Sequence, residues 1–234
     1  GPANYAMVKQ TTIQDEAEAM ATAYEHISWP SGGVNRIPYQ IYTDPEVYDQ
    51  EQQKLFRGPT WNFVALEQEV PNPGDYKSTY IGDTPVAVIR DEKGDINVVV
   101  NRCAHRGNLV CIKASGNTDR LTCVYHNWTY DLQGRLTHIV DEEDFFNLDK
   151  CTLGLKPIHC ETWRGFVFIN VMDTPRQTLA ESLGDWAREV EAFPFEAFEL
   201  VNVYSATVRC NWKIGLDAFQ EGYHALTLHS KSAC

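Results

Sequence analysis

Apolar and polar positions form short runs through the middle of the chain. Turn-forming pairs such as Pro73-Gly74 and Lys93-Gly94 separate these runs, which are rich in Val, Ile, Tyr and Phe. Short strands at this spacing are typical of a small antiparallel sandwich or barrel, which we expect to cover 57–160. The predicted strands are 61–66, 76–81, 86–90, 96–101, 121–125, 129–132 and 166–171.

Helical patterns flank this β-rich region. Residues 43–46 (TDPE) combine a capping side chain, a first-turn proline and an acid near the positive end of the helix dipole, so they predict the start of a helix. The fold class is therefore α+β, with a small antiparallel β domain inserted between N-terminal helices and the start of a second α+β domain. The predicted helices are 13–27, 43–56, 179–193 and 212–228, and a strand pattern occupies 201–209.

Composition narrows the classes of function. The 234 residues leave room for two domains, and a net charge of −12 argues against a nucleic-acid partner, since phosphate binding needs clustered Lys and Arg. The longest apolar run, 165–172, is strand-sized, and the first residues lack a signal-peptide pattern, so we expect no membrane span. Seven Cys without secretion signals favour reduced thiols and metal ligation in the cytoplasm over disulfides.

Two short pairs of metal-ligating residues lie in the predicted β domain. Cys103 and His105 form a C-x-H pair, and Cys123 and His126 form a C-x-x-H pair, with residues 106–122 between them. In a Rieske [2Fe–2S] cluster, two thiolates hold one iron and two neutral imidazoles hold the other, which raises the reduction potential. The four residues have the types and the mixed pairing that this cluster requires.

Each pair must come from a tight loop, because Cys and His have to reach different irons from one short segment. Gly107 and the turn-forming pair at 116–117 supply part of that geometry. The alternative is a Cys₂His₂ zinc site, but zinc fingers place Cys with Cys and His with His around a short ββα unit. Mixed pairs embedded in strands favour the Rieske cluster.

On these residues the chain resembles the large (α) subunits of Rieske non-haem iron oxygenases. The resemblance rests on 101–107 (NRCAHRG) and 123–130 (CVYHNWTY), and on the segment 57–100, which is similar to members that act on aromatic acids. Respiratory-chain Rieske proteins carry two further cysteines, forming a disulfide, where this chain has Asn108 and Tyr125. The resemblance therefore implies a low-potential cluster without that disulfide.

A second candidate metal site follows the N-W-K sequence at 211–213. Two His and a carboxylate with open coordination positions make a facial triad for Fe(II) and O₂. The resemblance implies that His224 and His229 ligate this iron and that Glu221 bridges a cluster His of one subunit to an iron-ligating His of its neighbour. Five-residue spacing sets the two His about 140° apart on a regular helix, so the helix must be distorted or end near His229. The alternative is a polar network on an amphipathic helix.

The chain departs from the family pattern in three places. The family usually has Asp where this chain has Glu221, and frequently Asn where it has Ala218. Its third iron ligand is an Asp far downstream, whereas only 230–234 follow His229 and none of them is a carboxylate. We therefore expect the catalytic domain to be truncated.

The resemblance implies three parts and a terminal oxygenase activity. These parts are an N-terminal helical segment (1–56) packing with the catalytic domain, the Rieske domain (57–160) and the start of the non-haem iron domain (161–234). Electrons from an NAD(P)H-dependent reductase, with or without a ferredoxin, would pass from the cluster by way of Glu221 to the Fe(II), where O₂ is activated to hydroxylate an organic substrate. The expected assembly is a homotrimer or an α3β3 complex with a small subunit.

Aromatic-ring hydroxylation by a dioxygenase, as in aromatic hydrocarbon catabolism, is the leading hypothesis. Monooxygenation with O- or N-demethylation is the second. A Rieske electron carrier without catalysis of its own is a third, but a carrier does not need the residues after Cys160 or a His pair after N-W-K. A catalytically silent fragment of an active parent is the fourth.

Overall fold

The computed structural model describes residues 26–31, 35–229 and 231. Contacts divide it into two compact units, one from the described parts of Gly1–Glu51 and Ser205–Cys234 and the other from Gln52–Tyr204. The helix predicted at 13–27 lies outside the described residues except for its last two positions. No described helix combines the length and apolar composition needed to cross a lipid bilayer.

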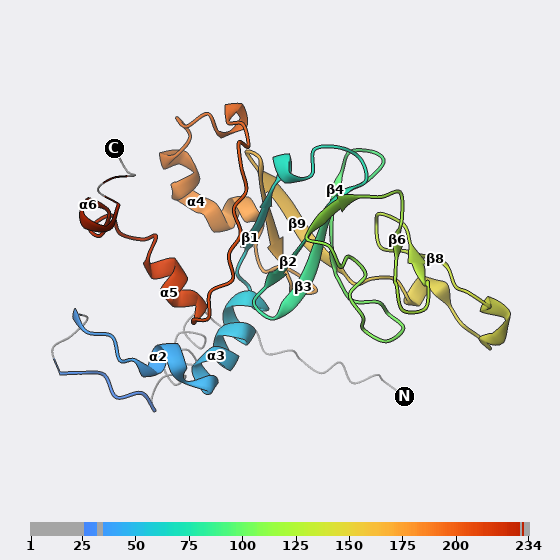
Figure 1. Ribbon diagram of the computed structural model, residues 1–234, viewed down its shortest axis with the longest axis horizontal. Helices are drawn as coiled ribbons and strands as arrows, with labels where there is room; N and C mark the ends of the chain where they lie inside the picture. The colour runs from blue at the N-terminus through green and yellow to red at the C-terminus, as the bar shows by residue number, and fades with distance from the viewer. Residues whose placement is uncertain (1–25, 32–34, 230, 232–234) are drawn as a thin grey trace, which may run out of the picture. The chain divides into compact units, whose positions relative to one another are not determined.

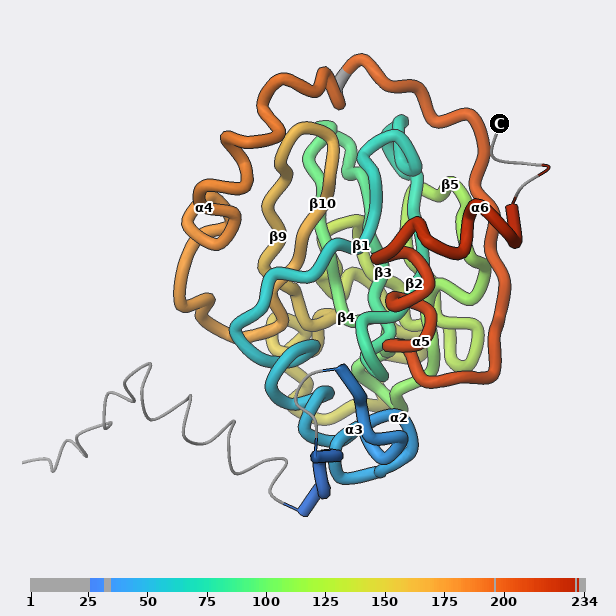
Figure 2. Tube along the Cα trace, turned by 90° about the vertical axis from the view of Figure 1, so that its left-hand side faces the viewer, coloured from blue at the N-terminus to red at the C-terminus, as the bar shows by residue number. Residues whose placement is uncertain are grey.

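A seven-stranded antiparallel sheet organises the unit Gln52–Tyr204 (Figure 1). The strand order is β1-β10-β9-β4-β3-β2-β5, and Figure 2 shows β9, β10 and β1 lying side by side. With helices outside the sheet, this architecture confirms the predicted α+β class. The strands are β1 (Asn62–Leu66), β2 (Asp75–Ile81), β3 (Thr84–Arg90), β4 (Ile96–Val100), β5 (Ser115–Asn117), β9 (Pro157–Trp163) and β10 (Phe166–Asn170).

A second, three-stranded sheet in the same unit carries part of the candidate cluster site. Its strands are β6 (Leu121–Thr122), β7 (Thr129–Tyr130) and β8 (Leu136–His138), in that order. The strands predicted at 121–125 and 129–132 are shorter than expected because the loop 123–128 interrupts them. Paired strands of only two to three residues are enough to hold the two ends of this loop together.

Strand β3 separates two apolar cores. Side chains alternate across a strand, so Val86 and Val88 enter one core while Ala87 and Ile89 enter the other. All four are fully buried, which explains why this run is apolar throughout instead of alternating. The core on the Ala87 side also contains Cys103, Cys123, Trp128 and Tyr130, so the candidate cluster loops rest directly on it.

The sequence patterns did not predict three of the strands, β5, β8 and β9. β8 has three residues, and β9 carries polar side chains at alternate positions, His159 and Glu161, which weaken the apolar signal. The turn expected at 116–117 is wrong, since both residues lie in β5 and pair with Tyr76 and Asp75 of β2.

The strand predicted at 201–209 is also wrong. These residues are exposed and pair with no strand among the residues that the structure describes. Val and Tyr give the segment a high β propensity, but a strand needs a neighbouring strand to bond its backbone. Propensity alone therefore did not decide the structure here.

The helices are shorter than their sequence patterns. The pattern at 43–56 forms α3 (Pro45–Glu51), which continues as a wider π-type turn, η2 (Gln52–Phe56), and α2 (Gln40–Thr43) precedes it. The helix expected at 179–193 is α4 (Leu179–Glu189), opened by a Thr178–Glu181 capping box and kinked at Gly184 (φ 50°). The pattern at 212–228 forms two helices, α5 (Trp212–Asp217) and α6 (Ala225–Leu228), instead of one.

Candidate metal centre

The two candidate cluster pairs lie in loops of the same construction. In the first loop the amide of Cys103 donates to the carbonyl of Asn108 and the amide of Gly107 donates to the carbonyl of Cys103, both at 2.8 Å. In the second, Cys123 donates to Trp128 and Asn127 donates to Cys123, both at 2.9 Å. Each loop thus closes from Cys to the fifth residue after it. Both loops turn the chain within six residues, as the ligand spacing requires.

The fourth residue after each Cys makes this turn possible. Gly107 has φ 70° and Asn127 has φ 55°, both in the left-handed region. Glycine reaches that region without strain, and Asn is the next most tolerant residue type. The sequence pointed to Gly107, but the equivalent role of Asn127 becomes visible only from the backbone.

The structure gives the two residue types different surroundings. The Cys103 and Cys123 side chains are buried, at 4% and 1% exposure, whereas His105 is half-buried and His126 is exposed. The two imidazole rings lie edge to face with centroids 4.6 Å apart. The arrangement thus places a thiol pair inward and an imidazole pair toward the surface.

These residues fit a two-iron cluster. Nδ1 of His105 is buried and has no hydrogen-bond partner among the described residues, which is unusual for a buried polar atom unless it binds a ligand. No set of three or more His, Cys, Asp or Glu side chains in the described part of the chain surrounds a single ion position. A zinc site needs four ligands around one ion, whereas each Rieske iron takes only two protein ligands.

Aromatic side chains surround the cluster loops. The Trp128 ring stacks on His105 with centroids 4.8 Å apart and planes 9° apart, and Phe145 packs edge-on against Trp128. Burial, together with the neighbouring His126 and Arg106, lowers the pKa of His105 and so favours the neutral imidazole. Neutral imidazole is the form that ligates iron.

Tyr130 reaches one of the sulfurs. Its hydroxyl lies 3.1 Å from Sγ of Cys103 and accepts a hydrogen bond from the amide of Ala104, also at 3.1 Å. Burial and the contact with Cys103 raise the pKa of Tyr130, so the hydroxyl keeps its proton. With the amide already donating to its oxygen, this proton is available to a Cys103 thiolate.

Asn101 braces the first loop from beneath. Its Oδ1 accepts from the amides of Val110 and Cys111 at 3.0 and 2.8 Å, and its Nδ2 donates to the carbonyl of Cys111 and to Oγ of Ser78. The residue is buried, so these bonds satisfy polar groups that water does not reach. Asn101 therefore fixes the chain leaving the first loop to strand β2.

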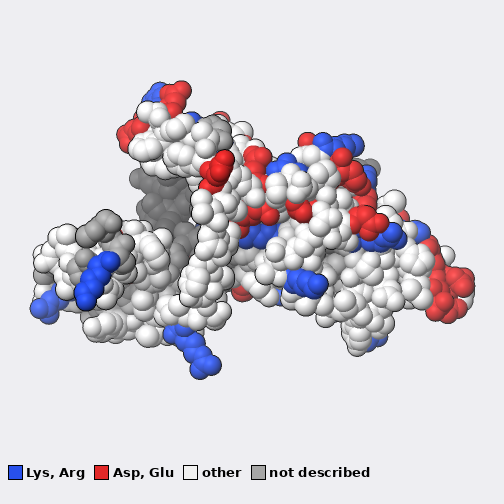
Figure 3. All heavy atoms as spheres, turned by 45° about the horizontal axis from the view of Figure 1, so that its top comes forward, with Lys and Arg blue, Asp and Glu red and all other residues white. Residues whose placement is uncertain are grey.

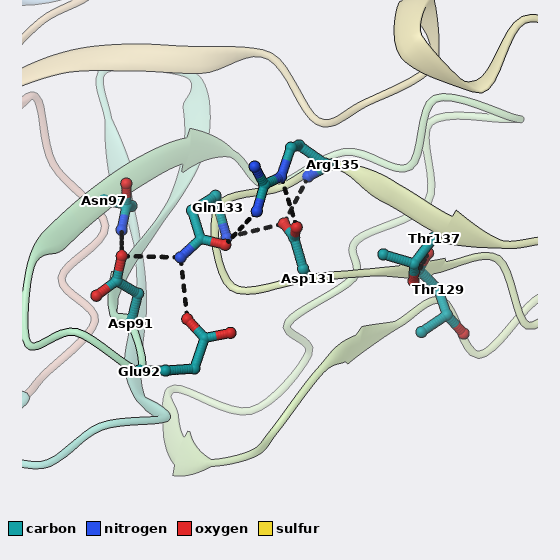
Figure 4. A network of polar contacts seen from close by, with 8 residues as sticks. All are labelled: Asp91, Glu92, Asn97, Thr129, Asp131, Gln133, Arg135 and Thr137. Carbon is teal, nitrogen blue, oxygen red and sulfur yellow. Dashed lines mark hydrogen bonds and ion pairs between the residues drawn. The ribbon is translucent and has the colours of Figure 1, made fainter.

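A polar network joins the small sheet to the large one (Figure 4). Nε2 of Gln133 donates to Asp91 at 2.8 Å and to Glu92 at 3.0 Å, which connects the β7–β8 turn to the β3–β4 turn. Within the β7–β8 turn, Arg135 pairs with Asp131 at 2.7 Å. The network lies at the end of β7 remote from the loop 123–128, so it anchors the sheet that carries the second candidate pair.

The second candidate site lies in the other unit. The His224 and His229 rings are edge to face, with centroids 5.5 Å apart, because α6 ends at Leu228 and His229 already has non-helical backbone angles. The expectation that the helix ends near His229 is therefore confirmed. Within the described residues no third ligand completes a site around one ion.

Glu221 contacts the first of these histidines. A carboxylate oxygen of Glu221 contacts Nδ1 of His224, and the carboxylate also accepts from the backbone amides of Tyr223 and His224. The His224 contact holds the pKa of Glu221 below its usual range. This carboxylate occupies Nδ1 and leaves Nε2 of His224 as the nitrogen that would hold a metal.

A buried charge supports the segment that leads to these histidines. Glu51, at the end of α3, is 4% exposed and accepts from Nε1 of Trp212 at 2.8 Å and from Nζ of Lys213 at 2.6 Å. The Tyr42 hydroxyl donates to Asp217 at 2.8 Å at the other end of α5. The N-W-K sequence at 211–213 thus has a structural role, because Trp212 and Lys213 fix α5 to Glu51. The sequence analysis did not predict this role for Glu51.

Comparison with known proteins agrees with this geometry. Residues 60–149 match the Rieske [2Fe-2S] domain, and residues 195–234 match the ring hydroxylating alpha subunit (catalytic domain). The fold and its cysteine–histidine loops thus define a Rieske iron–sulfur protein. The chain combines a Rieske domain with part of a ring-hydroxylating alpha subunit domain, and its relatives are named as large subunits of Rieske-type oxygenases.

Relatives include both dioxygenases and monooxygenases. The chain is 39% identical to the anthranilate 1,2-dioxygenase large subunit of Burkholderia cepacia, over 87% of this chain and 50% of that protein. It is 33% identical to the glycine betaine monooxygenase oxygenase subunit of Chromohalobacter salexigens, over 95% of this chain and 49% of that protein. The chain spans about half the length of the relatives it matches.

Solved structures show the same fold. Naphthalene 1,2-dioxygenase from Rhodococcus sp., bound to indole, superimposes with a TM-score of 0.76 at 28% identity, covering 94% of this chain and 50% of that one. A quaternary ammonium Rieske monooxygenase superimposes with a TM-score of 0.73 at 28% identity, covering 84% and 55%. The similarity therefore extends to enzymes of both reaction types.

Proposed function

We propose that the protein is the terminal oxygenase component of an aromatic-ring-hydroxylating system. In this proposal Cys103, His105, Cys123 and His126 hold the [2Fe–2S] cluster. The observation that carries the proposal is the pair of matching loops, which bury both cysteines and leave Nδ1 of His105 without a hydrogen-bond partner among the described residues. The domain limits proposed from the sequence, 1–56, 57–160 and 161–234, belong to the same hypothesis.

His224 and His229 would hold the mononuclear Fe(II), which supplies O₂ activation when bound. Glu221 positions the first of them: its carboxylate would accept a hydrogen bond from Nδ1–H and so favour the tautomer that presents Nε2. In the proposed assembly the same carboxylate would connect the cluster of one subunit with the iron of the next. A homotrimer or an α3β3 complex would bring these two together, supplied with electrons by an NAD(P)H-dependent reductase or a ferredoxin.

The substrate class follows from the relatives. The anthranilate dioxygenase and the terephthalate 1,2-dioxygenase of Comamonas sp., 34% identical over 87% of this chain, both have names that denote aromatic acids. Aromatic acids are therefore the first substrates to assay. The glycine betaine monooxygenase supports a second candidate, monooxygenation of a methylated amine. Product analysis under ¹⁸O₂ separates the two, because a dioxygenase places two labelled atoms in its product and a monooxygenase one.

The test of metal content is iron and acid-labile sulfide per chain on anaerobically purified protein, with an EPR spectrum after dithionite reduction. A rhombic reduced-cluster signal, with iron exceeding sulfide by one atom per chain, is the expected result. Cys123→Ser should abolish the signal, whereas Cys151→Ser, at an exposed cysteine outside both loops, should leave it unchanged. Equal iron and sulfide would reduce the chain to an electron carrier, and zinc without sulfide would refute the cluster.

A further inference from the structure

The helix that leads to the candidate iron ligands is held by polar contacts more than by apolar packing. None of the six residues of α5 is buried, and residues 217–223, which connect it to His224, are all exposed. Burial of an apolar face is what usually fixes a helix in place, and it contributes little here. Glu51 holds the start of α5 through Trp212 and Lys213, so the end of the helix depends on a different contact.

Tyr42 of α2 supplies this contact. Its hydroxyl donates to Oδ2 of Asp217 at 2.8 Å, and its ring centroid lies 5.8 Å from Nζ of Lys213. Lys213 and Asp217 are four residues apart, so they lie on the same face of α5. The hydrogen bond to Asp217 raises the pKa of Tyr42, so the hydroxyl keeps its proton and remains the donor. Tyr42 thus holds the last residue of α5 against α2.

Asp217 passes this restraint on to the turn that precedes Glu221. The carbonyl of Asp217 accepts from the amide of Gln220 at 3.3 Å, which closes a four-residue turn. Glu221 is the next residue, and its carboxylate contacts Nδ1 of His224. A closed turn keeps its two ends at a fixed separation, so a shift of Asp217 would displace Glu221.

From these contacts we infer that Tyr42 is a positioning residue for the candidate iron site. By holding Asp217 it keeps Glu221 against Nδ1 of His224, which favours the tautomer whose Nε2 is free to hold a metal. Tyr42 lies 175 residues before Asp217, so the sequence pattern around the two histidines does not reveal it. The role toward iron rests on the proposed function, whereas the effect on the His224 tautomer belongs to the chain without that metal.

The first measurement determines the His224 tautomer. Long-range ¹H–¹⁵N correlation spectra of the cluster-loaded chain, labelled at histidine and freed of mononuclear metal with EDTA, distinguish a protonated Nδ1 from a protonated Nε2. Spectra at about pH 8 report neutral imidazoles, and His224→Asn assigns the signal. Tyr42→Phe keeps the ring beside Lys213 and removes only the hydroxyl. It should lower the ratio of the Nδ1–H to the Nε2–H tautomer about fivefold.

The second measurement is the Kd for Co(II), obtained by isothermal titration calorimetry on the same chain. Tyr42→Phe should weaken binding about fivefold, which is less than the effect of removing Glu221, because Tyr42 acts through Glu221. In a Glu221→Ala background the same change should alter the Kd by less than about 1.5-fold, since the residue through which Tyr42 acts is gone. Effects of equal size in both backgrounds would overturn the proposal.

Variants of Asp217 test the contact itself. Asp217→Ala removes the acceptor and should match the effect of Tyr42→Phe, and the double variant should be no weaker than either single variant. Asp217→Asn retains an oxygen that accepts from the hydroxyl, so its tautomer ratio and Kd should stay within about twofold of the unchanged chain. Additive effects of Tyr42→Phe and Asp217→Ala would show that the two residues act independently, which would contradict the proposal.

Two exposed residues provide matched controls. Tyr39→Phe removes the hydroxyl of a tyrosine that is 86% exposed at the start of α2. Asp144→Ala removes an exposed carboxylate of η4 (Glu142–Asp144) in the other unit, and Figure 3 shows acidic side chains gathered at the end of the molecule beyond β8. Both quantities should change by less than about 1.5-fold in either control. A change in Tyr39→Phe as large as that in Tyr42→Phe would count against the proposal.

Iron analysis separates this inference from the proposed function. If iron exceeds sulfide by one atom per chain while Tyr42→Phe leaves the tautomer ratio and the Kd unchanged, the positioning role is wrong and the proposed function stands. If iron only equals sulfide and Co(II) does not bind, the proposed function is wrong, and the role of Tyr42 toward iron is overturned with it. A fivefold change in the tautomer ratio would in that case still support the contact from Tyr42 through Asp217 to His224.

Discussion

The Tyr130 hydroxyl lies 3.1 Å from the Cys103 sulfur, and the Ala104 amide donates to the same hydroxyl oxygen. The tyrosine is fully buried, so the phenol has no competing water. A hydrogen bond to a ligating sulfur stabilises the more electron-rich, reduced cluster. The pair therefore couples a side chain of β7 to the potential of the site.

Replacing this tyrosine should lower the reduction potential. Tyr130→Phe removes a hydrogen bond worth about 1 kcal/mol, which corresponds to about 40 mV for a one-electron couple. Protein-film voltammetry measures the change. Tyr125→Phe removes the hydroxyl of an exposed tyrosine in the second loop and should leave the potential unchanged; a comparable shift in both variants would contradict the role of Tyr130.

Asp91 should control stability toward acid. Burial raises the pKa of Asp91, but hydrogen bonds from Gln133, Asn97 and the backbone amides of Lys93 and Asp95 more than offset this, so the net pKa lies below its usual value. A carboxylate with a depressed folded-state pKa stabilises the protein above its unfolded-state pKa, and this contribution is lost as the pH falls through the folded-state pKa.

Asp91→Asn should therefore reduce the free energy of unfolding at neutral pH by about 1–3 kcal/mol. In the variant an amide nitrogen faces N–H donors whose hydrogen bonds the carboxylate oxygen accepted, so these bonds are lost. The difference between the two proteins should shrink below about pH 4. Urea unfolding across the pH range tests both statements. Asp95→Asn in the same turn is the control, and an equal loss in that variant would count against the network in Figure 4.

The buried carboxylate of Glu51 should contribute more to the free energy of unfolding than an exposed carboxylate does. Glu51→Gln leaves the Lys213 ammonium, whose side chain is 17% exposed, without its counter-charge. Breaking such a pair costs about 3 kcal/mol. Chemical denaturation should show this loss, with Asp49→Asn, at an exposed acid of α3, changing the unfolding free energy by less than about 0.5 kcal/mol. Similar values for the two variants would contradict a supporting role for Glu51.

Glu221 should tune metal affinity at the His224–His229 pair. Removing a carboxylate that orients a ligating histidine costs about 10–100-fold in metal affinity. Glu221→Ala should therefore weaken Co(II) binding by this factor, followed by the visible d–d absorption of the bound ion. Glu199→Ala removes an exposed glutamate elsewhere and should leave the titration unchanged. Unaltered binding in Glu221→Ala would show that the Nδ1 contact does not position His224.

The two candidate cluster loops could be recognised in the sequence because their signal is local. Cys103, His105, Cys123 and His126 follow a spacing that few other sites use, and the strands around them show ordinary apolar patterns. Other features depend on partners distant in the sequence. The strand prediction at 201–209 was wrong because these residues have no partner strand in the part of the chain that the structure describes. The burial of Glu51 was not predicted because a glutamate on an amphipathic helix is usually exposed.

The helix pattern at 212–228 failed for a different reason. Glu221 caps the backbone amides of Tyr223 and His224, which interrupts the helix and starts α6 afresh. A carboxylate that binds its own backbone competes with helix continuation, and sequence periodicity does not register that competition. The break sets where α6 begins, whereas the end of α6 at Leu228 brings the His224 and His229 rings together.

Strand β3 is buried on both of its faces, so the two apolar cores of the unit Gln52–Tyr204 depend on the same strand. Ala87 and Ile89 support the cluster loops while Val86 and Val88, their immediate neighbours, hold the opposite core together. A shift of this strand cannot be confined to one face. Loss of iron and sulfide would therefore destabilise residues beyond the loops, and amide exchange along β3 and its partners β2 and β4 would become faster. Cluster insertion would be a late folding step that stabilises the whole sheet.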